Sequence, residues 1–288
     1  TNLTIHLIAI ARSAGIHITW DDFSDLSAVI PSLTKMYPNG SADVNYFQAS
    51  GGMSYLIKSL LEHGLLHEDV NTILGKGLKR YTKEPFLKDG ELIWREGPQK
   101  SLDESVLTSV ENAFSKTGGL KVLKGNIGTS VIKTSAVKEE NWIVEAPAII
   151  FEDQEELLEA FKRKELNKDF IAVVRYQGPK AKGMPELHRL TPVLSILQNN
   201  GYKVALATDG RMSGASGKVP AAIHLSPEAM DGGLLSKLKD GDLLRLDAVK
   251  GELICFNEAE VKARTAPKPP VISQDGCGRE LFENFRKL

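Results

Sequence analysis

The feature that most constrains this sequence is a change of hydrophobic period near residue 118. From residue 1 to about residue 82, apolar residues recur every three or four positions, the spacing of amphipathic helices, and Gly15 and Gly64 stand where helix ends favour a left-handed residue. Beyond residue 118 the pattern becomes short strands separated by glycine turns. The chain should therefore fold as a helical layer followed by a domain built on β-strands.

The second pattern indicates the architecture of that domain. Mixed short strands with only two interrupting helices predict a barrel-like β domain with helical insertions, carrying the loops of any site. The predicted helices cover residues 154–165 and 185–199. The predicted strands cover residues 120–123, 130–134, 142–151, 170–176, 203–207 and the hairpin 243–256, which turns at Lys250 and Gly251.

Prolines and glycines mark the boundaries. Residues 83–117 open with prolines and glycines among charges and without a sustained period, which predicts a linker or crossing segment. We expect a helical part over residues 1–82, the β-barrel-like domain over 118–262 and a C-terminal tail over 263–288.

Charge and composition exclude several classes of protein. The net charge of −1 gives no global basic field for nucleic acid or an anionic membrane, so a phosphate or carboxylate must be held locally. No apolar run approaches the roughly 20 residues needed to span a bilayer, and no export signal is visible. Two cysteines fit a reducing cytoplasm. The chain enters a helix at once, without Met, which favours a fragment or processed product.

The most unusual segment is residues 207–220, which follow an apolar strand. Three glycines, three hydroxyl groups, Arg211 and Lys218 stand in one loop. Glycines let backbone N–H groups approach an anion and the two cations can add charge-assisted bonds, so the composition suits a carboxylate or phosphate. A plain surface turn between strands explains the composition equally well. The order of residues is not that of a P-loop, because Val219 stands where a hydroxyl is needed.

A second segment, residues 175–188, joins a strand to the helix predicted from Pro185. Glu186 falls in the first turn of that helix, where a carboxylate commonly complements the helix dipole. The alternative is an oxygen ligand for Mg²⁺. His188 is either an acid or base or, more commonly, a buried hydrogen-bonding residue.

The remaining histidines and cysteines suggest no metal site. His6, His63, His67 and His224 lack zinc-ligand spacing, and no role follows for them. Cys255 and Cys277 cannot by themselves supply the thiolates of an iron–sulfur cluster.

Several strings together resemble the dihydroxyacid and 6-phosphogluconate dehydratase family. They are residues 119–126, Arg175 to Pro179, Gly183 to Glu186, Thr208 to Gly214 and Ser226 to Ala229. Residues 1–12 and 51–53 fit as well, so the resemblance covers nearly the whole chain. Residues 213–224 resemble the 6-phosphogluconate branch, and Gln177 stands where the branched-chain enzymes carry Glu.

The resemblance implies a fold and cofactors. Residues 1–82 would end a large α/β domain, and the later region would form a barrel like the swivelling domain of aconitase. The family's cluster-ligating cysteines and several Mg²⁺-site carboxylates would lie before Thr1, so this chain alone should be inactive. An iron–sulfur cluster, [4Fe–4S] in this branch, is implied, with Mg²⁺ or another divalent cation in other members.

The resemblance also implies a reaction: dehydration of 6-phosphogluconate to 2-keto-3-deoxy-6-phosphogluconate in the Entner–Doudoroff route. Ser213 would take the Cα proton as an alkoxide or, alternatively, only hydrogen-bond the substrate. Glu186 would ligate the metal. The substrate contacts would come from Asp209, Gly210, Arg211, Gly214, Ser216 and Lys218.

Other readings stay open. The substrate could be another sugar acid or a branched-chain dihydroxy acid, or the chain could be a non-catalytic binding or assembly domain. The expected partners are a phosphorylated sugar acid and, as in most of the family, a second copy, in a cytoplasmic homodimer.

Overall fold

The computed structural model describes residues 2–212 and 217–271. Two compact units divide the chain: residues 1–24 and 120–288 form the first, and residues 25–119 form the second. The second unit is therefore inserted into the sequence of the first. Ser213, Gly214 and Ser216 lie outside the described residues, as does Cys277.

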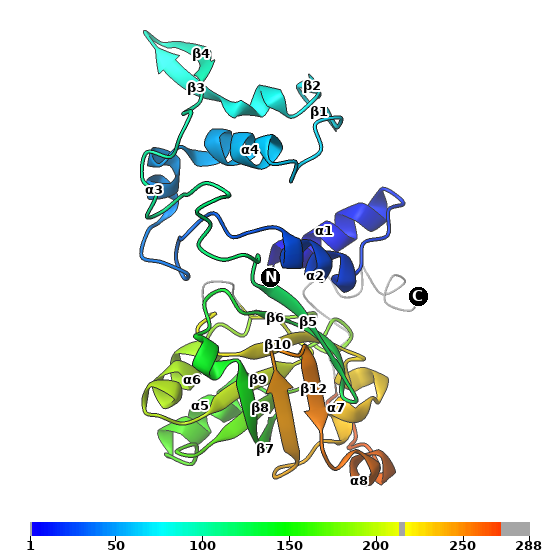
Figure 1. Ribbon diagram of the computed structural model, residues 1–288. Coiled ribbons are helices and arrows are strands. Elements are labelled where there is room, and N and C mark those ends of the chain that lie inside the picture. The colour runs from blue at the N-terminus through cyan, green and yellow to red at the C-terminus, as the bar shows by residue number, and fades with distance from the viewer. Residues whose placement is uncertain (1, 213–216, 272–288) are drawn as a thin grey trace. The chain divides into compact units, whose positions relative to one another are not determined.

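Eight strands of the described part of the first unit form a closed barrel, which confirms the predicted fold class (Figure 1). The strands are β5 (Leu120–Gly125), β6 (Gly128–Lys133), β7 (Ile143–Phe151), β8 (Phe170–Val174), β9 (Val204–Thr208), β10 (Ala221–Ser226), β11 (Leu243–Asp247) and β12 (Glu252–Cys255). Their order around the barrel is β10-β6-β5-β12-β11-β7-β8-β9. The run β7-β8-β9-β10 is parallel. Except for the parallel contact of β12 with β5, the other neighbours are antiparallel.

The parallel strands are buried on both faces, so their side chains alternate between two cores. In β8, Ile171 and Val173 belong to one apolar cluster, while Phe170, Ala172 and Val174 belong to the other. The first cluster also takes side chains from the antiparallel strands, and the second takes them from two covering helices. Strands that are buried on both faces carry apolar residues at consecutive positions, and β8 and β9 are therefore recognisable in the sequence as apolar runs.

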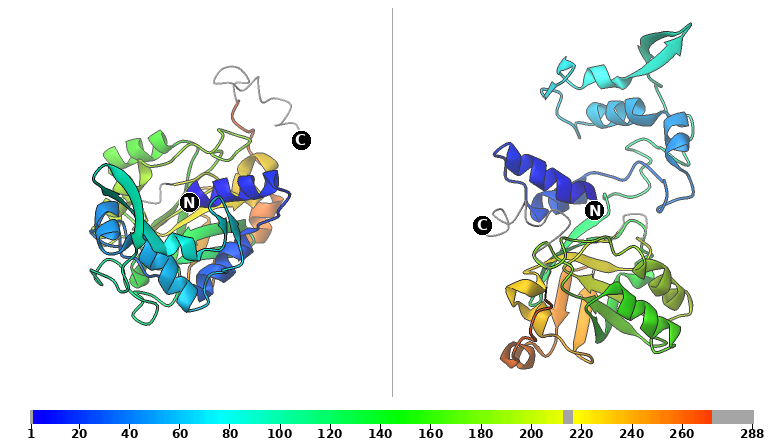
Figure 2. Two further views of the ribbon diagram at one scale, coloured as in Figure 1. Left: turned by 90° about the horizontal axis from the view of Figure 1, so that it is seen from above. Right: turned by 180° about the vertical axis from the view of Figure 1, so that it is seen from behind.

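Helices cover the barrel on two sides. α5 (Gln154–Lys162) and α6 (Leu190–Asn199) connect the parallel strands and lie together on one side (Figures 1 and 2). α7 (Leu234–Lys237) contacts α8 (Glu258–Ala263) on the other. Short 3₁₀ turns, η2 (Glu139–Asn141) and η4 (Ala229–Asp231), complete this part. No described helix is long and apolar enough to span a bilayer.

The N-terminal segment joins the barrel through its second helix. α1 (Asn2–Ser13) is followed by α2 (Trp20–Val29). Thr19 begins α2 with reciprocal bonds: its N–H donates to Asp22 Oδ2 over 2.7 Å, and the Asp22 N–H donates to Thr19 Oγ1 over 3.4 Å. The Val122 N–H of β5 donates to Ser24 Oγ over 3.3 Å, which holds the first turns of α2 against the barrel.

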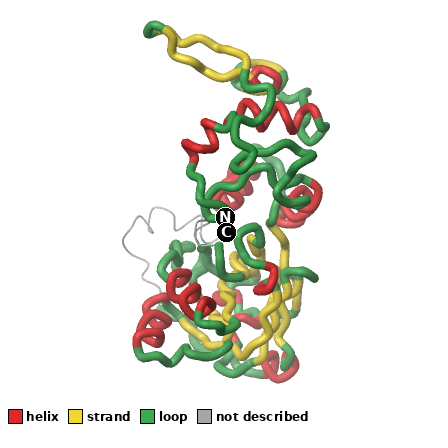
Figure 3. Tube along the Cα trace, turned by 60° about the vertical axis from the view of Figure 1, so that its left-hand side comes forward, coloured by secondary structure: helices red, strands yellow, loops and turns green. Residues whose placement is uncertain are grey.

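The second unit has a small core and a long hairpin. Phe47, Tyr55 and Leu107 form its apolar cluster. The elements are α3 (Val44–Ala49), α4 (Gly52–Glu62), β1 (Asn71–Thr72), β2 (Gly75–Lys76), η1 (Lys79–Thr82), β3 (Lys83–Lys88) and β4 (Glu91–Glu96). β3 and β4 form a regular two-stranded ladder, visible as the long yellow pair in Figure 3.

One hairpin was not predicted, and one predicted helix start was wrong. Residues 83–96, within the predicted linker, form the β3–β4 hairpin, in which Asp89 and Gly90, with φ of 51° and 85°, make a two-residue turn. The helix predicted from Pro185 begins only at Leu190, so Glu186 is not in a helical turn; it forms an isolated bridge with Arg211.

Candidate functional site

Three loops meet where the parallel strands end. β8, β9 and β10 run in the same direction, so the segments that follow Val174, Thr208 and Ser226 leave the same edge of the sheet. The carboxyl edge of parallel strands is where ligand sites of α/β sheets gather. Two of the segments singled out in the sequence, residues 175–188 and 207–220, are the first two of these loops.

Asp209 ties the three loops together. Its Oδ2 accepts from the Tyr176 N–H at 3.1 Å and the Ala229 N–H at 2.9 Å, and its Oδ1 accepts from the Gln177 N–H at 2.9 Å. The side chain is almost wholly buried, and this burial raises the pKa of Asp209, although the three N–H groups act in the opposite direction. The carboxylate expected to bind substrate is thus committed to backbone N–H groups.

Glu228 closes over the loop after β8. It accepts from the Lys180 N–H at 3.1 and 3.2 Å, and burial raises the pKa of this carboxyl group. Gly178 permits the approach, because a Cβ there would stand 2.4 Å from Glu228 Oε2. The Lys180 ammonium group pairs with Asp231, and the Lys182 ammonium group donates to Asp153 at 2.9 Å, so neither lysine is simply solvated.

Arg211 binds the other end of that loop. Its Nε donates to the Met184 carbonyl at 2.7 Å, and a terminal nitrogen lies 3.6 Å from Glu186 Oε2. The predicted metal ligand Glu186 is therefore in an ion pair. Gly210 lies tightly against the same loop, since a Cβ would be 2.6 Å from the Gln177 Cβ.

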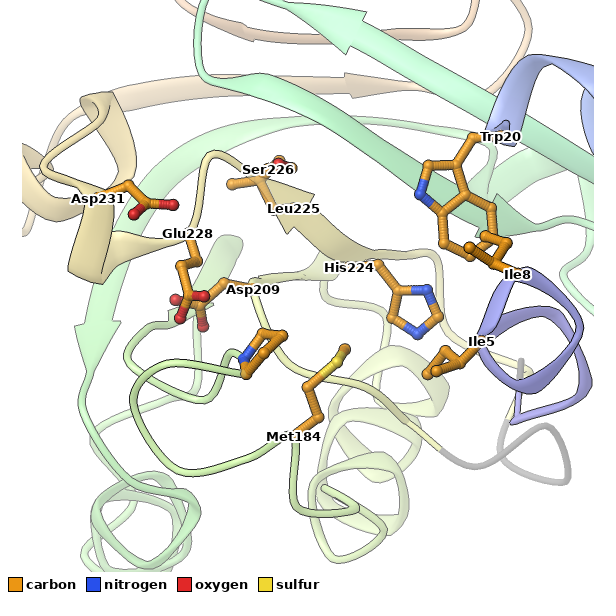
Figure 4. A pocket seen from close by; sticks show the side chains of 11 residues that line it. Ile5, Ile8, Trp20, Met184, Asp209, His224, Leu225, Ser226, Glu228 and Asp231 are labelled. Atoms are coloured by element: carbon orange, nitrogen blue, oxygen red, sulfur yellow. The ribbon is translucent and has the colours of Figure 1, made fainter. Parts of the chain in front are cut away.

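A cavity of about 280 Å³ opens beside these loops (Figure 4). One wall is apolar, with side chains from α1, α2 and the loop after β8, and the opposite wall carries carboxylates. The lining residues are Ile5, Ile8, Trp20, Pro179, Met184, Asp209, His224, Leu225, Ser226, Glu228 and Asp231.

His224 is a cavity residue to which the sequence analysis gave no role. The side chain is only 7% exposed, and neither ring nitrogen has a hydrogen-bond partner among the described residues. Burial lowers the pKa of His224 to about 4, and the positive charge of Arg211 adds to the effect. The imidazole ring lies 5.2 Å from the Trp20 ring, and the backbone N–H of His224 donates to the Gly210 carbonyl at 2.9 Å. The spacing between histidines cannot identify such a residue. The signal in the sequence is the position of His224 in an apolar strand that follows the glycine loop.

Strained backbone gathers at the same place. Tyr176, Met184 and His224 have left-handed φ values of 60°, 55° and 56°. Such conformations cost roughly 1 to 3 kcal/mol each and concentrate at ligand sites. The hydroxyl of the buried Tyr176 also has no partner among the described residues.

The structure does not bring every predicted residue to this cavity. Asp209, Gly210, Arg211 and Glu186 lie together around the first two loops. Lys218 instead lines a second cavity of about 510 Å³. The residues that line it are Ala136, Lys138, Glu140, Asn141, Ser195, Gln198, Asn199 and Lys218.

The described residues do not supply a metal centre. Within residues 2–212 and 217–271, no group of three His, Cys, Asp or Glu side chains could hold a metal ion. Cys255 is buried in the barrel core, and its thiol donates to Asn257 Oδ1 at 3.1 Å. Neither Cys255 nor the paired Glu186 fits an iron–sulfur cluster on its own.

Comparison with known families assigns both parts of the chain to one family. The model for the C-terminal part of the dihydroxy-acid/6-phosphogluconate dehydratases matches residues 105–288, and that for the N-terminal part matches residues 1–81. The chain belongs to this family, which confirms the resemblance seen in the sequence.

Individual relatives fall in both branches. The chain is 59% identical to a phosphogluconate dehydratase of Pseudomonas aeruginosa over 99% of its length, and 57% identical to that of Escherichia coli over 100%. It is 35% identical to a dihydroxy-acid dehydratase of Caldanaerobacter subterraneus over 94% of its length. These alignments cover 47%, 48% and 47% of the relatives, so the chain spans about half of their length.

Proposed function

We propose that the complete protein dehydrates 6-phosphogluconate to 2-keto-3-deoxy-6-phosphogluconate, the reaction expected of the Entner–Doudoroff route. The observation that carries this proposal is the difference in identity between the two branches. Phosphogluconate dehydratases share 59% and 57% of this sequence, whereas a dihydroxy-acid dehydratase shares 35%.

The reaction removes the proton from C2 and the hydroxyl group from C3, and the resulting enol becomes the keto acid. Ser213 is our candidate for the base at C2. Arg211 and the glycine N–H groups of its loop suit the carboxylate, because the guanidinium group is already oriented by its bond to Met184. Lys218, an exposed cation on the second cavity, is the candidate for the phosphate. Gly214 and Ser216 remain candidates for further contacts.

The proposal includes a cofactor and an oligomeric state. An iron–sulfur cluster, with or without a divalent cation, would take its ligands from outside the described residues, because those residues provide no suitable group. We expect the complete protein to act as a cytoplasmic homodimer.

The test is turnover by the complete, cofactor-loaded protein with each of two acids. Keto-acid formation from 6-phosphogluconate should exceed that from a branched-chain 2,3-dihydroxy acid by orders of magnitude. A preference for the dihydroxy acid would overturn the substrate assignment. No turnover of either acid, with cluster iron and sulfide present, would favour a binding module.

Ser213→Ala tests the base. Loss of a positioned base costs roughly 10²- to 10⁴-fold in kcat. The matched comparison is Ser216→Ala, which removes a neighbouring hydroxyl of the same loop and should change KM more than kcat. Near-normal kcat in Ser213→Ala would exclude Ser213 as the base.

A further inference from the structure

The cavity beside the three loops contains an imidazole whose two nitrogens have no hydrogen-bond partner among the described residues. His224 is 7% exposed, and its Nδ1 and Nε2 are both buried without a hydrogen bond within the described part of the chain. A buried polar group left unsatisfied costs roughly 1 to 3 kcal/mol, so its retention calls for an explanation. A ligand in the cavity that the ring lines would satisfy it.

Backbone conformation and packing hold the His224 ring in place, rather than hydrogen bonds from its nitrogens to the described residues. The left-handed backbone at His224 and the bond from its N–H to the Gly210 carbonyl fix the start of the side chain. Trp20 lies against the ring at 5.2 Å with an interplanar angle of 39°, and Figure 4 shows Ile5 near it. A polar group oriented by packing alone is preorganised for a ligand.

The other lining residues define the ligand's chemistry. None of the 11 described residues that line the cavity is Lys or Arg, whereas three are carboxylates, Asp209, Glu228 and Asp231, each of which already accepts from a backbone N–H group or an ammonium group. A phosphate or carboxylate would find no cation among these described lining residues to bind it. A hydroxyl group can donate to a carboxylate and exchange hydrogen bonds with a neutral imidazole, which has one donor and one acceptor.

The size and the apolar wall fit a short polyol. A volume of about 280 Å³ holds several groups of the size of water, each of which takes roughly 30 Å³ in the liquid. Trp20, Ile5 and Ile8 offer an apolar face to the C–H side of such a chain.

We infer that His224 binds the hydroxyl-bearing middle of the sugar-acid chain in this cavity, with the two anionic ends lying outside it. The inference rests on the proposed function for the identity of the acid. It makes His224 a specificity-determining residue for polyhydroxylated substrates.

The test uses a nearly isosteric pair in the complete protein, His224→Asn and His224→Leu. Asn keeps a donor and an acceptor and tolerates positive φ, whereas Leu has neither polar atom. Calorimetry measures the binding of 6-phosphogluconate, and of inorganic phosphate as a probe of the anion site. Thermal unfolding reports on the fold, and His224→Gly, free of backbone strain, replaces Leu if that variant does not fold.

The affinity of His224→Leu for 6-phosphogluconate should fall about 10- to 100-fold, the equivalent of one or two lost hydrogen bonds. His224→Asn should recover most of it, and phosphate binding should be unchanged in both. Trp20 should report the same event, through a change of fluorescence on binding that Trp20→Phe removes.

Wild-type affinity in the folded Leu or Gly variant would overturn the inference, whatever the turnover. If the complete protein binds 6-phosphogluconate in a way that depends on His224 but does not turn it over, the inferred binding site stands and only the proposed reaction is refuted. An equal loss of phosphate binding would mean that the substitution disturbs the whole site, and would also overturn the inference.

Discussion

Acidification should destabilise this chain through His224. The pKa of His224 is lowered from 6.5 to about 4 in the folded state, chiefly by burial. Above pH 6.5 the ring is neutral in both states and contributes nothing to the pH dependence. As the pH falls from about 6.5 to about 4, the unfolded chain binds a proton that the folded chain does not, so stability is lost. The loss is complete below pH 4 and amounts to about 3 kcal/mol, because each pKa unit corresponds to about 1.4 kcal/mol.

Urea unfolding at pH 7, 6, 5 and 4 measures this loss. The free energy of unfolding of the 288-residue chain is compared at each pH with that of His224→Asn, which cannot titrate at this position. The other histidines and the carboxylates are common to both proteins, so their contributions cancel in the difference. That difference should move by about 3 kcal/mol between pH 7 and pH 4, in the direction that disfavours the wild type at low pH. A difference that is constant across this range would refute the burial argument.

Three further substitutions or labels test other contacts. Gly178→Ala should destabilise the chain by roughly 1 to 3 kcal/mol, measured by urea unfolding, because the new Cβ would stand 2.4 Å from Glu228 Oε2. Arg264→Ala should lower the free energy of unfolding in the same assay, because it removes the two bonds, of 2.6 and 2.8 Å, that the guanidinium group makes to the buried Asp242. Cys255, 1% exposed and with its thiol pKa raised by burial, should resist alkylation until the chain is unfolded, as followed by mass spectrometry of its peptide.

Each of these predictions has a matched control. Gly232→Ala adds a Cβ in open space at φ 73°, so its cost is the backbone strain alone; Gly178 has no left-handed φ, so a negligible cost for Gly178→Ala would contradict the steric argument. Arg163→Ala breaks an exposed ion pair with Glu165 and should change the free energy of unfolding very little; an equally small change for Arg264→Ala would mean that its pair is equally dispensable. Rapid labelling of Cys255 in the folded chain would contradict its burial.

The barrel was predictable because several of its strands can be recognised in the sequence as apolar runs between turn residues. β8 and β9 are short apolar runs bounded by polar residues and glycine, and the β11–β12 hairpin turns at Lys250 and Gly251 as expected. The order of strands around the barrel was not predictable, because pairing between distant strands is decided by tertiary packing. The β3–β4 hairpin was missed although its Asp89-Gly90 turn is a strong local signal, because Pro85 and the surrounding charges suggested a linker.

The site was predictable only in outline. The glycine loop after β9 and the loop after β8 were singled out from composition, and the structure brings them together. The role of Asp209 could not be read from the sequence, because backbone N–H groups as partners leave no trace in residue types. Glu186 was misplaced because Pro185 suggested an early helix start, whereas the segment first pairs with Arg211 as a bridge.

The insertion of residues 25–119 between two parts of the barrel unit has a kinetic consequence. The bond from the Val122 N–H to Ser24 Oγ joins positions 98 apart in the sequence, so α2 can dock only after a long loop has closed. Relative to a connection of about ten residues, the closure entropy costs about 2 kcal/mol, at about 0.6 kcal/mol for each doubling of length. During synthesis, residues 20–24 cannot dock until β5 has emerged from the ribosome. Replacing the insertion by a short linker should therefore speed the docking of residues 20–24 on the barrel.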